Sequence, residues 1–308
     1  MADRYINIFT DFGFKKVFGE EINKDLLIAF LNELLKGEQT IKELSYKKNE
    51  QLGSSDLDRK AIFDLYCENE KGEKFIVEIQ KTKQKFFKDR SLYYSTFPIV
   101  EQAEQGEWDF KLKAVYTIAI LDFVFDDMDR KKTVVHHVQL MDTKEKVVFY
   151  PKLTFVYLQM PNFNKTEDEL ETQFDKWLFV LKNLHKLHDR PKKLQERVFE
   201  KFFNCAEIAH FAPQERVAYE DSLKYYRDLK NSLDTAREEG EAKGELKGEA
   251  KGKIEGKIEG KIEVATALIE IGEDNEKIVR VTGLSIDEII TLRKKMADSS
   301  IDPEEKTN

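Results

Sequence analysis

The stretch that decides the fold is Ala61-Ile-Phe-Asp-Leu-Tyr-Cys67, followed after a short turn by Phe75-Ile-Val-Glu-Ile-Gln80. Both runs consist of β-type residues with a two-residue period, which is the spacing of a half-buried strand. Glu70-Lys-Gly72 separates them, and its glycine suits the left-handed position that closes a three-residue hairpin turn. We therefore predict an antiparallel hairpin over residues 61–80.

The hairpin brings two carboxylates to one face. Asp64 and Glu78 each lie seven residues from Lys71, the centre of the turn. Directly opposite residues of an antiparallel pair point to the same side, and Gln80 joins them two residues along the strand. The two carboxylates repel each other unless a cation neutralises them, and oxygen ligands suit Mg²⁺ or Mn²⁺. A register slip or a bulge at Gly72 would undo this geometry, so a solvated hairpin face is the competing interpretation.

A basic stretch follows the hairpin. Residues 81–90 carry five basic side chains and one acidic side chain. Such a run can contact phosphates, and a carboxylate-bound metal can polarise a phosphoryl oxygen and lower the pKa of a bound water. Aromatic residues lie within or next to the run: Phe86, Phe87, Tyr93 and Tyr94. The hairpin and the basic stretch together suit phosphodiester hydrolysis in a nucleic acid, and a solvated hairpin face followed by an exposed basic helix start is the competing interpretation.

The rest of the first half predicts an α/β domain. Helical spacing runs from Thr10 or Asp11 toward a stop at Gly37, and a second helix over residues 86–105 is interrupted by Pro98. Three further strand-like runs cover residues 113–125, 133–141 and 147–160. The order of helix, strands, helix and strands, followed by a long helical region, indicates the α/β class with a helical extension.

The C-terminal region has a different pattern. Residues 240–263 repeat glycine at every fourth position. Six glycines cost about 5–6 kcal/mol of helix propensity relative to alanine, and each repeat overshoots a helical turn by about 40°. We predict a tether or a helix that needs a partner, with self-association through the glycine face as the sharper alternative. Residues 264–295 then predict a small helical hairpin with Ser285 and Glu288 as a capping box, which in outline resembles half of a helix-turn-helix.

Composition limits the partners and the location. Acidic residues outnumber basic ones by 59 to 51, for a formal net charge of −8, and this excludes coating of nucleic acid or membrane through bulk charge. The longest apolar run, at residues 114–121, is too short to span a bilayer, and no signal peptide is apparent. Cys67 and Cys205 cannot build a disulfide framework. We expect a cytoplasmic protein with no membrane partner.

The motifs also stand in a characteristic order. Asp64, then thirteen residues, then Glu78-Ile-Gln80 resemble the D…(D/E)-x-K signature of the PD-(D/E)XK nucleases, with glutamine in the lysine position. The accompanying motifs are Thr10-Asp-Phe-Gly-Phe-Lys-Lys-Val-Phe-Gly19, Phe30-Leu-Asn32, Ile62-Phe-Asp64-Leu, Arg90-Ser-Leu-Tyr-Tyr94 and Val115-Tyr-Thr-Ile-Ala-Ile-Leu121. Over residues 5–295 the chain resembles the Rpn-type recombination-promoting nucleases, also described as PD-(D/E)XK nuclease family transposases.

The resemblance implies a restriction-endonuclease-like core, a mixed sheet flanked by helices, that cleaves DNA with a metal in recombination or mobile elements. Carried onto this sequence, Asp64 and Glu78 would bind Mg²⁺, or Mn²⁺, with help from the backbone carbonyl of Ile79. Gln80 would stand where the lysine orients the attacking water. An acidic group on the first helix often joins such sites. Asp11 matches it best, and Glu33 is the competitor.

The glutamine raises the question of missing charge. A neutral amide can position a water, but it cannot supply positive charge to a developing oxyanion. Either Lys15, Lys81 or Lys83 compensates, or activity is low. Arg90 and Tyr94 would support the site or contact phosphate. If the chemistry is lost, the fold remains as a module that binds DNA or protein, and a weaker third hypothesis makes the last 45 residues a DNA-binding headpiece.

We expect four segments and two kinds of partner. The segments are an α/β nuclease-like domain over residues 1–163, a helical extension packed on it over 164–237, a glycine-repeat segment over 238–263, and a helical hairpin with a tail over 264–308. The expected partners are DNA and further copies of the chain, joined through the C-terminal arm.

Overall fold

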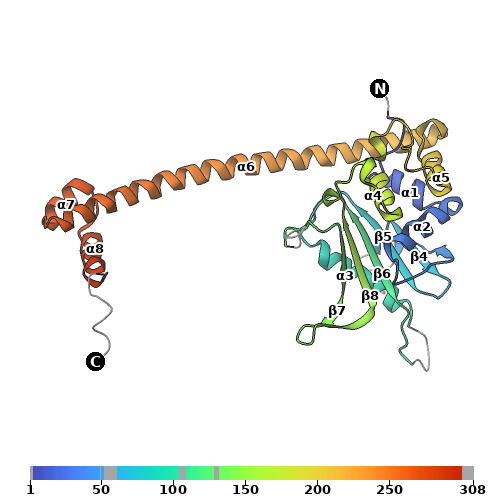
Figure 1. The fold of residues 1–308 in the computed structure, drawn as a ribbon, viewed down its shortest axis with the longest axis horizontal. Helices are drawn as coiled ribbons and strands as arrows, with labels where there is room; N and C mark the ends of the chain where they lie inside the picture. The colour runs from blue at the N-terminus through green and yellow to red at the C-terminus, as the bar shows by residue number, and fades with distance from the viewer. Residues whose placement is uncertain (1–2, 49, 52–60, 104–108, 128–131, 300–308) are drawn as a thin grey trace. The chain divides into compact units, whose positions relative to one another are not determined.

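A mixed six-stranded sheet forms the centre of the molecule. The computed structural model describes residues 3–48, 50–51, 61–103, 109–127 and 132–299, and the chain divides into two compact units, Met1–Lys230 and Asn231–Asn308. In spatial order the strands are β1 (Leu44–Tyr46), β4 (Leu65–Asn69), β5 (Lys74–Gln80), β6 (Val115–Leu121), β8 (Val147–Gln159) and β7 (Val135–Asp142) (Figure 1). The three central strands β5, β6 and β8 are parallel, and their neighbours on both sides are antiparallel. The sheet confirms the predicted α/β class and the restriction-endonuclease-like architecture.

The predicted hairpin is formed by β4 and β5. Leu65 lies opposite Val77, which is the register centred on Lys71, and Gly72 has a φ of 77° as the turn requires. The prediction of one continuous first strand is wrong. The run is broken at residues 63–64, because the side chain of Asp64 accepts a strand N–H there, and the two residues before the break form β3 (Ala61–Ile62), which pairs with β2 (Glu50–Gln51).

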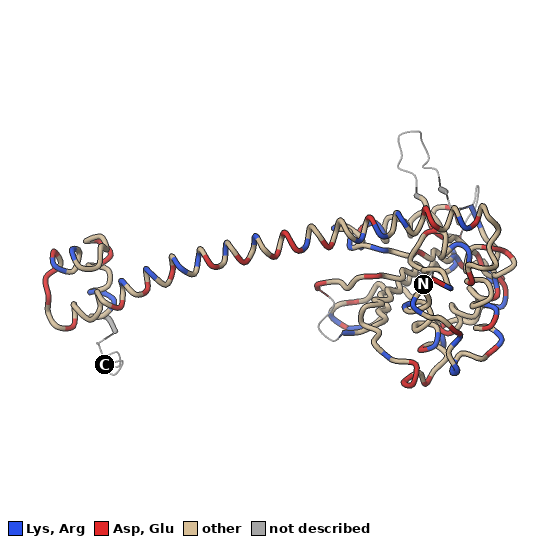
Figure 2. The backbone as a smooth tube through the Cα atoms, turned by 90° about the horizontal axis from the view of Figure 1, so that it is seen from above, with Lys and Arg blue, Asp and Glu red and all other residues tan. Residues whose placement is uncertain are grey.

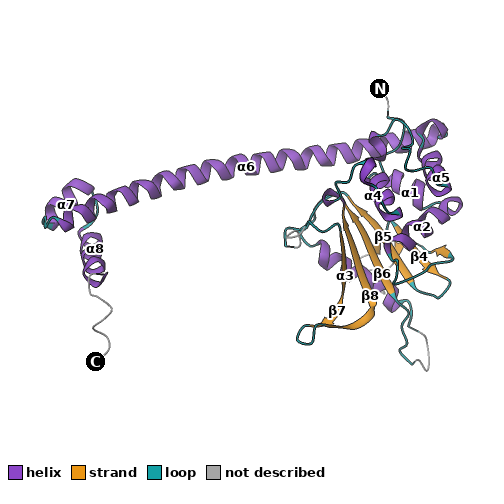
Figure 3. Cartoon of the chain, in the orientation of Figure 1, coloured by secondary structure: helices purple, strands orange, loops and turns teal. Residues whose placement is uncertain are grey.

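A layer of helices covers one face of the sheet. It contains α1 (Asp11–Phe18), α2 (Lys24–Leu34), α4 (Gln173–Asn183) and α5 (Arg197–Ala206), and it encloses the largest apolar core (Figure 3). The prediction of one helix up to Gly37 is wrong, because the chain turns at Gly19. Gly19 is the C-cap of α1, where its N–H donates to the Lys15 carbonyl, and an added Cβ would lie 2.8 Å from that carbonyl and 3.0 Å from the Leu65 side chain of β4. Short 3-10 turns are η1 (Glu21–Asn23), η3 (Met160–Asn162), η4 (Glu167–Glu169), η5 (Leu184–Lys186) and η6 (Ile208–His210).

Helix α3 (Phe87–Val100) lies on the opposite face of the sheet. It contains Pro98 in its last turn, and its Tyr94 and Phe97 pack on a small buried cluster that includes Ile76 of β5. Alternate residues of a strand share a face, so Glu78 and Gln80 point to the same side as Ile76. The first turns of α3 are therefore in position to contact them.

Helix α6 (Pro213–Glu270) begins in the first unit and continues into the second. In the first unit the hydroxyl of Tyr226 donates to the Asp122 carboxylate at 2.9 Å. Residues 240–263 lie within this helix. Every residue over 231–259 is exposed, and acidic and basic residues alternate along this part of α6 (Figure 2).

The second unit ends in the predicted helical hairpin. Its helices are α7 (Asn275–Thr282) and α8 (Ile286–Ser299), and they pack with the end of α6 around Ala265, Ile278, Leu284 and Ile289. Ser285 and Glu288 form the predicted capping box through reciprocal hydrogen bonds. Among the described helices, none is both long enough and apolar enough to cross a bilayer.

Candidate active site

The predicted carboxylates lie at the carboxyl end of β5, beside the parallel strand β6. Glu78 is only 6% exposed on this strand, and Asp64 directly precedes β4 on the neighbouring side. The Asp64 carboxylate accepts the backbone N–H of Ile79 at 2.8 Å. The N–H and C=O of one strand residue point to the same side, so the carbonyl of Ile79 also faces Asp64. Ligands of open α/β sheets bind at such strand ends.

Burial and neighbouring charges perturb both carboxylates. Burial, followed by the charge of Asp64, raises the pKa of Glu78 to about 7, although Arg90 opposes the shift. Burial also raises the pKa of Asp64, against the lowering effect of the Ile79 N–H. Desolvated carboxyls that repel each other are a frequent feature of functional sites, because a bound cation relieves both effects.

The donors fit a hard divalent cation. Two carboxylates and a backbone carbonyl are oxygen ligands, and Mg²⁺ commonly takes one or two carboxylates and completes its shell with water and substrate phosphate. No cluster of three or more acidic, histidine or cysteine side chains suited to a metal occurs within the described residues.

Helix α1 adds one acid and one base to the site. Thr10 caps the helix by accepting the N–H of Gly13 at 3.0 Å, which places Asp11 at the first position. Asp11 pairs with Lys15 at 2.9 Å, and the charges of both residues act on Asp64. Glu33 of α2, the competing candidate, pairs instead with Lys36, which follows that helix. In addition to burial, the charge of Asp11 raises the pKa of Asp64.

Lys81 lies on the same side of the site. Burial lowers its pKa, while Asp11 and Asp64 act in the opposite direction. Its ammonium lies 5.6 Å from the ring centroid of Tyr225, on the first part of α6. The sequence alone did not identify Tyr225, because no local pattern links α6 to the end of β5.

Arg90 approaches the site from α3. Its guanidinium donates to the Gln80 side-chain oxygen at 2.5 Å and lies 3.7 Å from the Glu78 carboxylate. The Tyr94 ring centroid lies 5.6 Å from the guanidinium carbon. The amide of Gln80 donates in turn to the backbone carbonyl of Thr82 at 3.1 Å. Both ends of the Gln80 side chain are therefore engaged.

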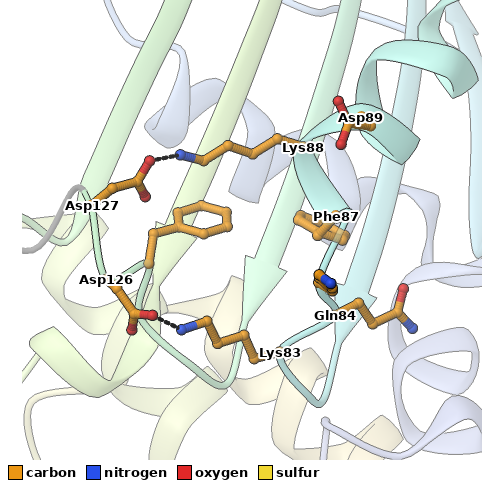
Figure 4. A pocket seen from close by; sticks show the side chains of 9 residues that line it. Lys83, Gln84, Phe87, Lys88, Asp89, Asp126 and Asp127 are labelled. Atoms are coloured by element: carbon orange, nitrogen blue, oxygen red, sulfur yellow. Dashed lines mark hydrogen bonds and ion pairs between the residues drawn. The ribbon is translucent and has the colours of Figure 1, made fainter.

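Lys83 belongs to a neighbouring cavity instead. Its ammonium pairs with Asp126, and Lys88 pairs with Asp127 at 2.6 Å (Figure 4). The cavity has a volume of about 380 Å³. It is lined by Lys83, Gln84, Lys85, Phe87, Lys88, Asp89, Phe125, Asp126 and Asp127. The structure thus brings Asp11, Lys15, Lys81 and Arg90 to the carboxylate pair and leaves Lys83 in an ion pair outside it.

Comparison with known proteins gives a single family. The model of the PD-(D/E)XK nuclease family transposases matches residues 8–236. Neither the curated proteins nor the solved structures contain a match. The matched region includes the whole sheet, both helical layers and every residue of the candidate site. The chain therefore belongs to the PD-(D/E)XK nuclease family transposases.

Proposed function

We propose that the protein is an endonuclease that hydrolyses DNA phosphodiester bonds with Mg²⁺, or Mn²⁺, bound by Asp64 and Glu78. The observation that carries the proposal is the desolvated carboxylate pair at the end of β5, in which burial and Asp64 raise the pKa of Glu78. The family supports a nuclease of mobile elements, which implies DNA as the substrate. We also propose a cytoplasmic location, which suits the free thiols of Cys67 and Cys205.

Each residue of the site has a proposed role. Asp64, Glu78 and the carbonyl of Ile79 hold the metal, and Asp11 assists through its position beside Asp64. When bound, the metal polarises the phosphoryl oxygen and lowers the pKa of a water ligand. Gln80 stands at the position where the lysine of the family signature orients the water, and its side chain is held by Arg90 and by the carbonyl of Thr82. Three lysines contribute to the binding of phosphate: Lys15 and Lys81 beside the carboxylates, and Lys83 in the neighbouring cavity. Tyr94 supports the site.

The test of this function compares cleavage by matched variants. A supercoiled plasmid is incubated with Mg²⁺ or Mn²⁺ and either wild type, Asp64→Ala, Glu78→Ala or Glu145→Ala. Glu145 is an exposed carboxylate outside the site and serves as the control. We expect cleavage by wild type and Glu145→Ala, and a loss of about 10²-fold or more in the two site variants. Equal cleavage by all four proteins would overturn the assignment.

The second candidate function is a binding module without chemistry. The observation that favours it is Gln80, a neutral side chain where the family signature has lysine. Calorimetry separates the two candidates, because an enzyme of this kind binds Mg²⁺ or Mn²⁺ through Asp64. Retained DNA binding together with no metal binding would favour the module.

We further propose that the arm over residues 231–270 joins two copies of the chain. The glycine repeat is exposed and helical, and its propensity cost is about 5–6 kcal/mol. Exposed i,i+4 ion pairs such as Lys251 with Glu255 and Lys253 with Glu249 offset only a small part of that cost. Its charges also invert at the middle, from Gly-Glu-x-Lys in the first three repeats to Gly-Lys-Ile-Glu in the last three. Two antiparallel copies centred on Lys251 therefore bring opposite charges level. The pairs are 241 with 261, 245 with 257 and 249 with 253.

Charge reversal tests this assembly. One variant changes Glu241, Glu245 and Glu249 to lysine, and the other changes Lys253, Lys257 and Lys261 to glutamate. Each variant alone carries like charges at the paired positions, so we expect both to be monomers in analytical ultracentrifugation, and their mixture to form a dimer. Monomeric wild type, or dimers of either variant alone, would contradict the proposed assembly.

A further inference from the structure

Arg90 of α3 contacts two residues of the candidate site, Gln80 and Glu78. Its guanidinium donates to Gln80 at 2.5 Å and to the side-chain oxygen of Gln84 at 2.5 Å, and it lies 3.7 Å from Glu78. The rings of Phe87 and Tyr94 lie 5.1 Å and 5.6 Å from its central carbon. These contacts fix a charged group beside the carboxylate pair.

The charge of Arg90 is permanent, since a guanidinium keeps its proton in proteins. Its Nε atom is buried and has no hydrogen-bond partner within the described residues. An arginine that served only to stabilise the fold would be expected to use this donor, because a buried unpaired donor is costly. The orientation instead directs one end of the fork at Gln80 and Glu78.

Gln80 and Arg90 are chemically matched. The Gln80 oxygen accepts from Arg90, and its amide group donates to the carbonyl of Thr82, so the amide orientation is determined. A lysine at position 80 would place a second positive charge against the guanidinium. Glutamine at position 80 is therefore compatible with arginine at position 90. Compared with a signature lysine on the strand, the positive charge lies on helix α3.

We propose that Arg90 is the positioning residue that supplies the site with the positive charge which the family signature assigns to a lysine at position 80. It acts through Gln80 and beside Glu78. This inference rests on the proposed nuclease function. It replaces the expectation that Lys15, Lys81 or Lys83 compensates: Lys15 and Lys81 lie on the side of Asp11 and Asp64, and Lys83 is paired with Asp126.

The proposal predicts effects of opposite sign on metal binding and on cleavage. Arg90 repels a cation that approaches Glu78, so Arg90→Gln should bind Mg²⁺ more tightly, by about threefold or more. The same variant should lower kcat by about tenfold or more at saturating metal, because the charge near the reacting phosphate is lost. A residue with only a structural role would weaken both, and a residue that only contacts DNA would change KM.

The experiment combines these readouts with a rescue. Calorimetry without DNA gives the Mg²⁺ affinity, and cleavage of an oligonucleotide duplex gives kcat and KM. Arg190→Gln is the control, because Arg190 is also 29% exposed and also contacts a glutamine and a glutamate, Gln195 and Glu200. The Gln80→Lys change is then added to Arg90→Gln, which restores the signature lysine.

We expect Arg90→Gln to bind Mg²⁺ more tightly and to cleave more slowly, Arg190→Gln to match wild type, and the double variant to regain most of the lost kcat. A kcat of Arg90→Gln within about twofold of wild type, weaker Mg²⁺ binding, or a double variant no faster than Arg90→Gln would overturn the inference while leaving the nuclease function intact. Should Arg90→Gln unfold, the double variant and Arg90→Lys, which keeps the charge, carry the same comparison. Wild type without metal binding or cleavage would overturn the proposed function itself.

Discussion

Replacing Glu78 by glutamine should stabilise the metal-free protein. The ordinary pKa of this carboxyl is 4.5, and in the fold burial and the charge of Asp64 raise it to about 7. The pKa of the folded state lies above that of the unfolded state, so the stability that the carboxyl contributes is complete below pH 4.5 and is lost as the pH rises through about 7. The shift corresponds to about 3 kcal/mol at high pH, by the usual conversion of 1.36 kcal/mol per pKa unit.

The variant Glu78→Gln is isosteric and carries no charge at any pH. It should therefore be more stable than wild type by up to about 3 kcal/mol at about pH 8 and equal to it at about pH 4. The value for Glu78 already includes the favourable effect of Arg90, so the loss of that contact needs no separate correction. In thermal unfolding this difference corresponds to an increase of about 5–10 °C in the Tm of the first unit.

The assay is thermal unfolding followed by circular dichroism, in buffer with a chelator, at both pH values. Glu145→Gln, at an exposed carboxylate, is the control and should match wild type throughout. Mg²⁺ should then raise the Tm of wild type more than that of Glu78→Gln, because the variant loses one of the two carboxylate ligands. A Tm of Glu78→Gln equal to or below that of wild type at about pH 8 would refute the claim that Glu78 is destabilised for function.

Three further predictions follow from the same structure. The affinity for Mg²⁺ should rise with pH through about 7, because Glu78 must lose its proton to bind metal; calorimetry that shows no change between about pH 6 and pH 8 would contradict this. Gly72→Ala should destabilise the first unit by about 1 kcal/mol in urea unfolding, because the φ of 77° suits glycine. At Gly252 an added Cβ meets nothing within 4 Å, so Gly252→Ala should instead raise the helicity of a monomeric arm. Ser285→Ala should cost the second unit about 1 kcal/mol through loss of the α8 cap, measured by unfolding of a fluorescently labelled arm.

The hairpin could be predicted because its determinants are local. The turn residues fix the register, and the two-residue period fixes the face, so the pairing centred on Lys71 follows from the residues themselves. The break before Leu65 could not be predicted in this way, since it depends on the side chain of Asp64 meeting the N–H of Ile79.

Other features depend on contacts between distant segments. The first helix ends at Phe18, and the close approach of Leu65 of β4 to Gly19 is a contact of which a helical apolar pattern contains no sign. The same holds for the site. Asp11 and the carboxylate pair follow from motifs, but the partnership of Arg90 with Gln80 requires the placement of α3 over the end of β5. For the arm, propensity argued against an isolated helix, and the structure shows a helix whose exposed repeat the proposed second copy would cover.

The most direct test of the central claim is a crystal structure of the protein soaked in Mn²⁺, with the anomalous signal of the ion measured. We predict one strong peak between the carboxylates of Asp64 and Glu78, within ligand distance of the Ile79 carbonyl, and its loss in Glu78→Ala crystals. Such a peak would place the metal where the desolvated carboxylates of β4 and β5 meet. Wild-type crystals with no peak between these residues, grown from protein that cleaves DNA in Mn²⁺, would contradict the account.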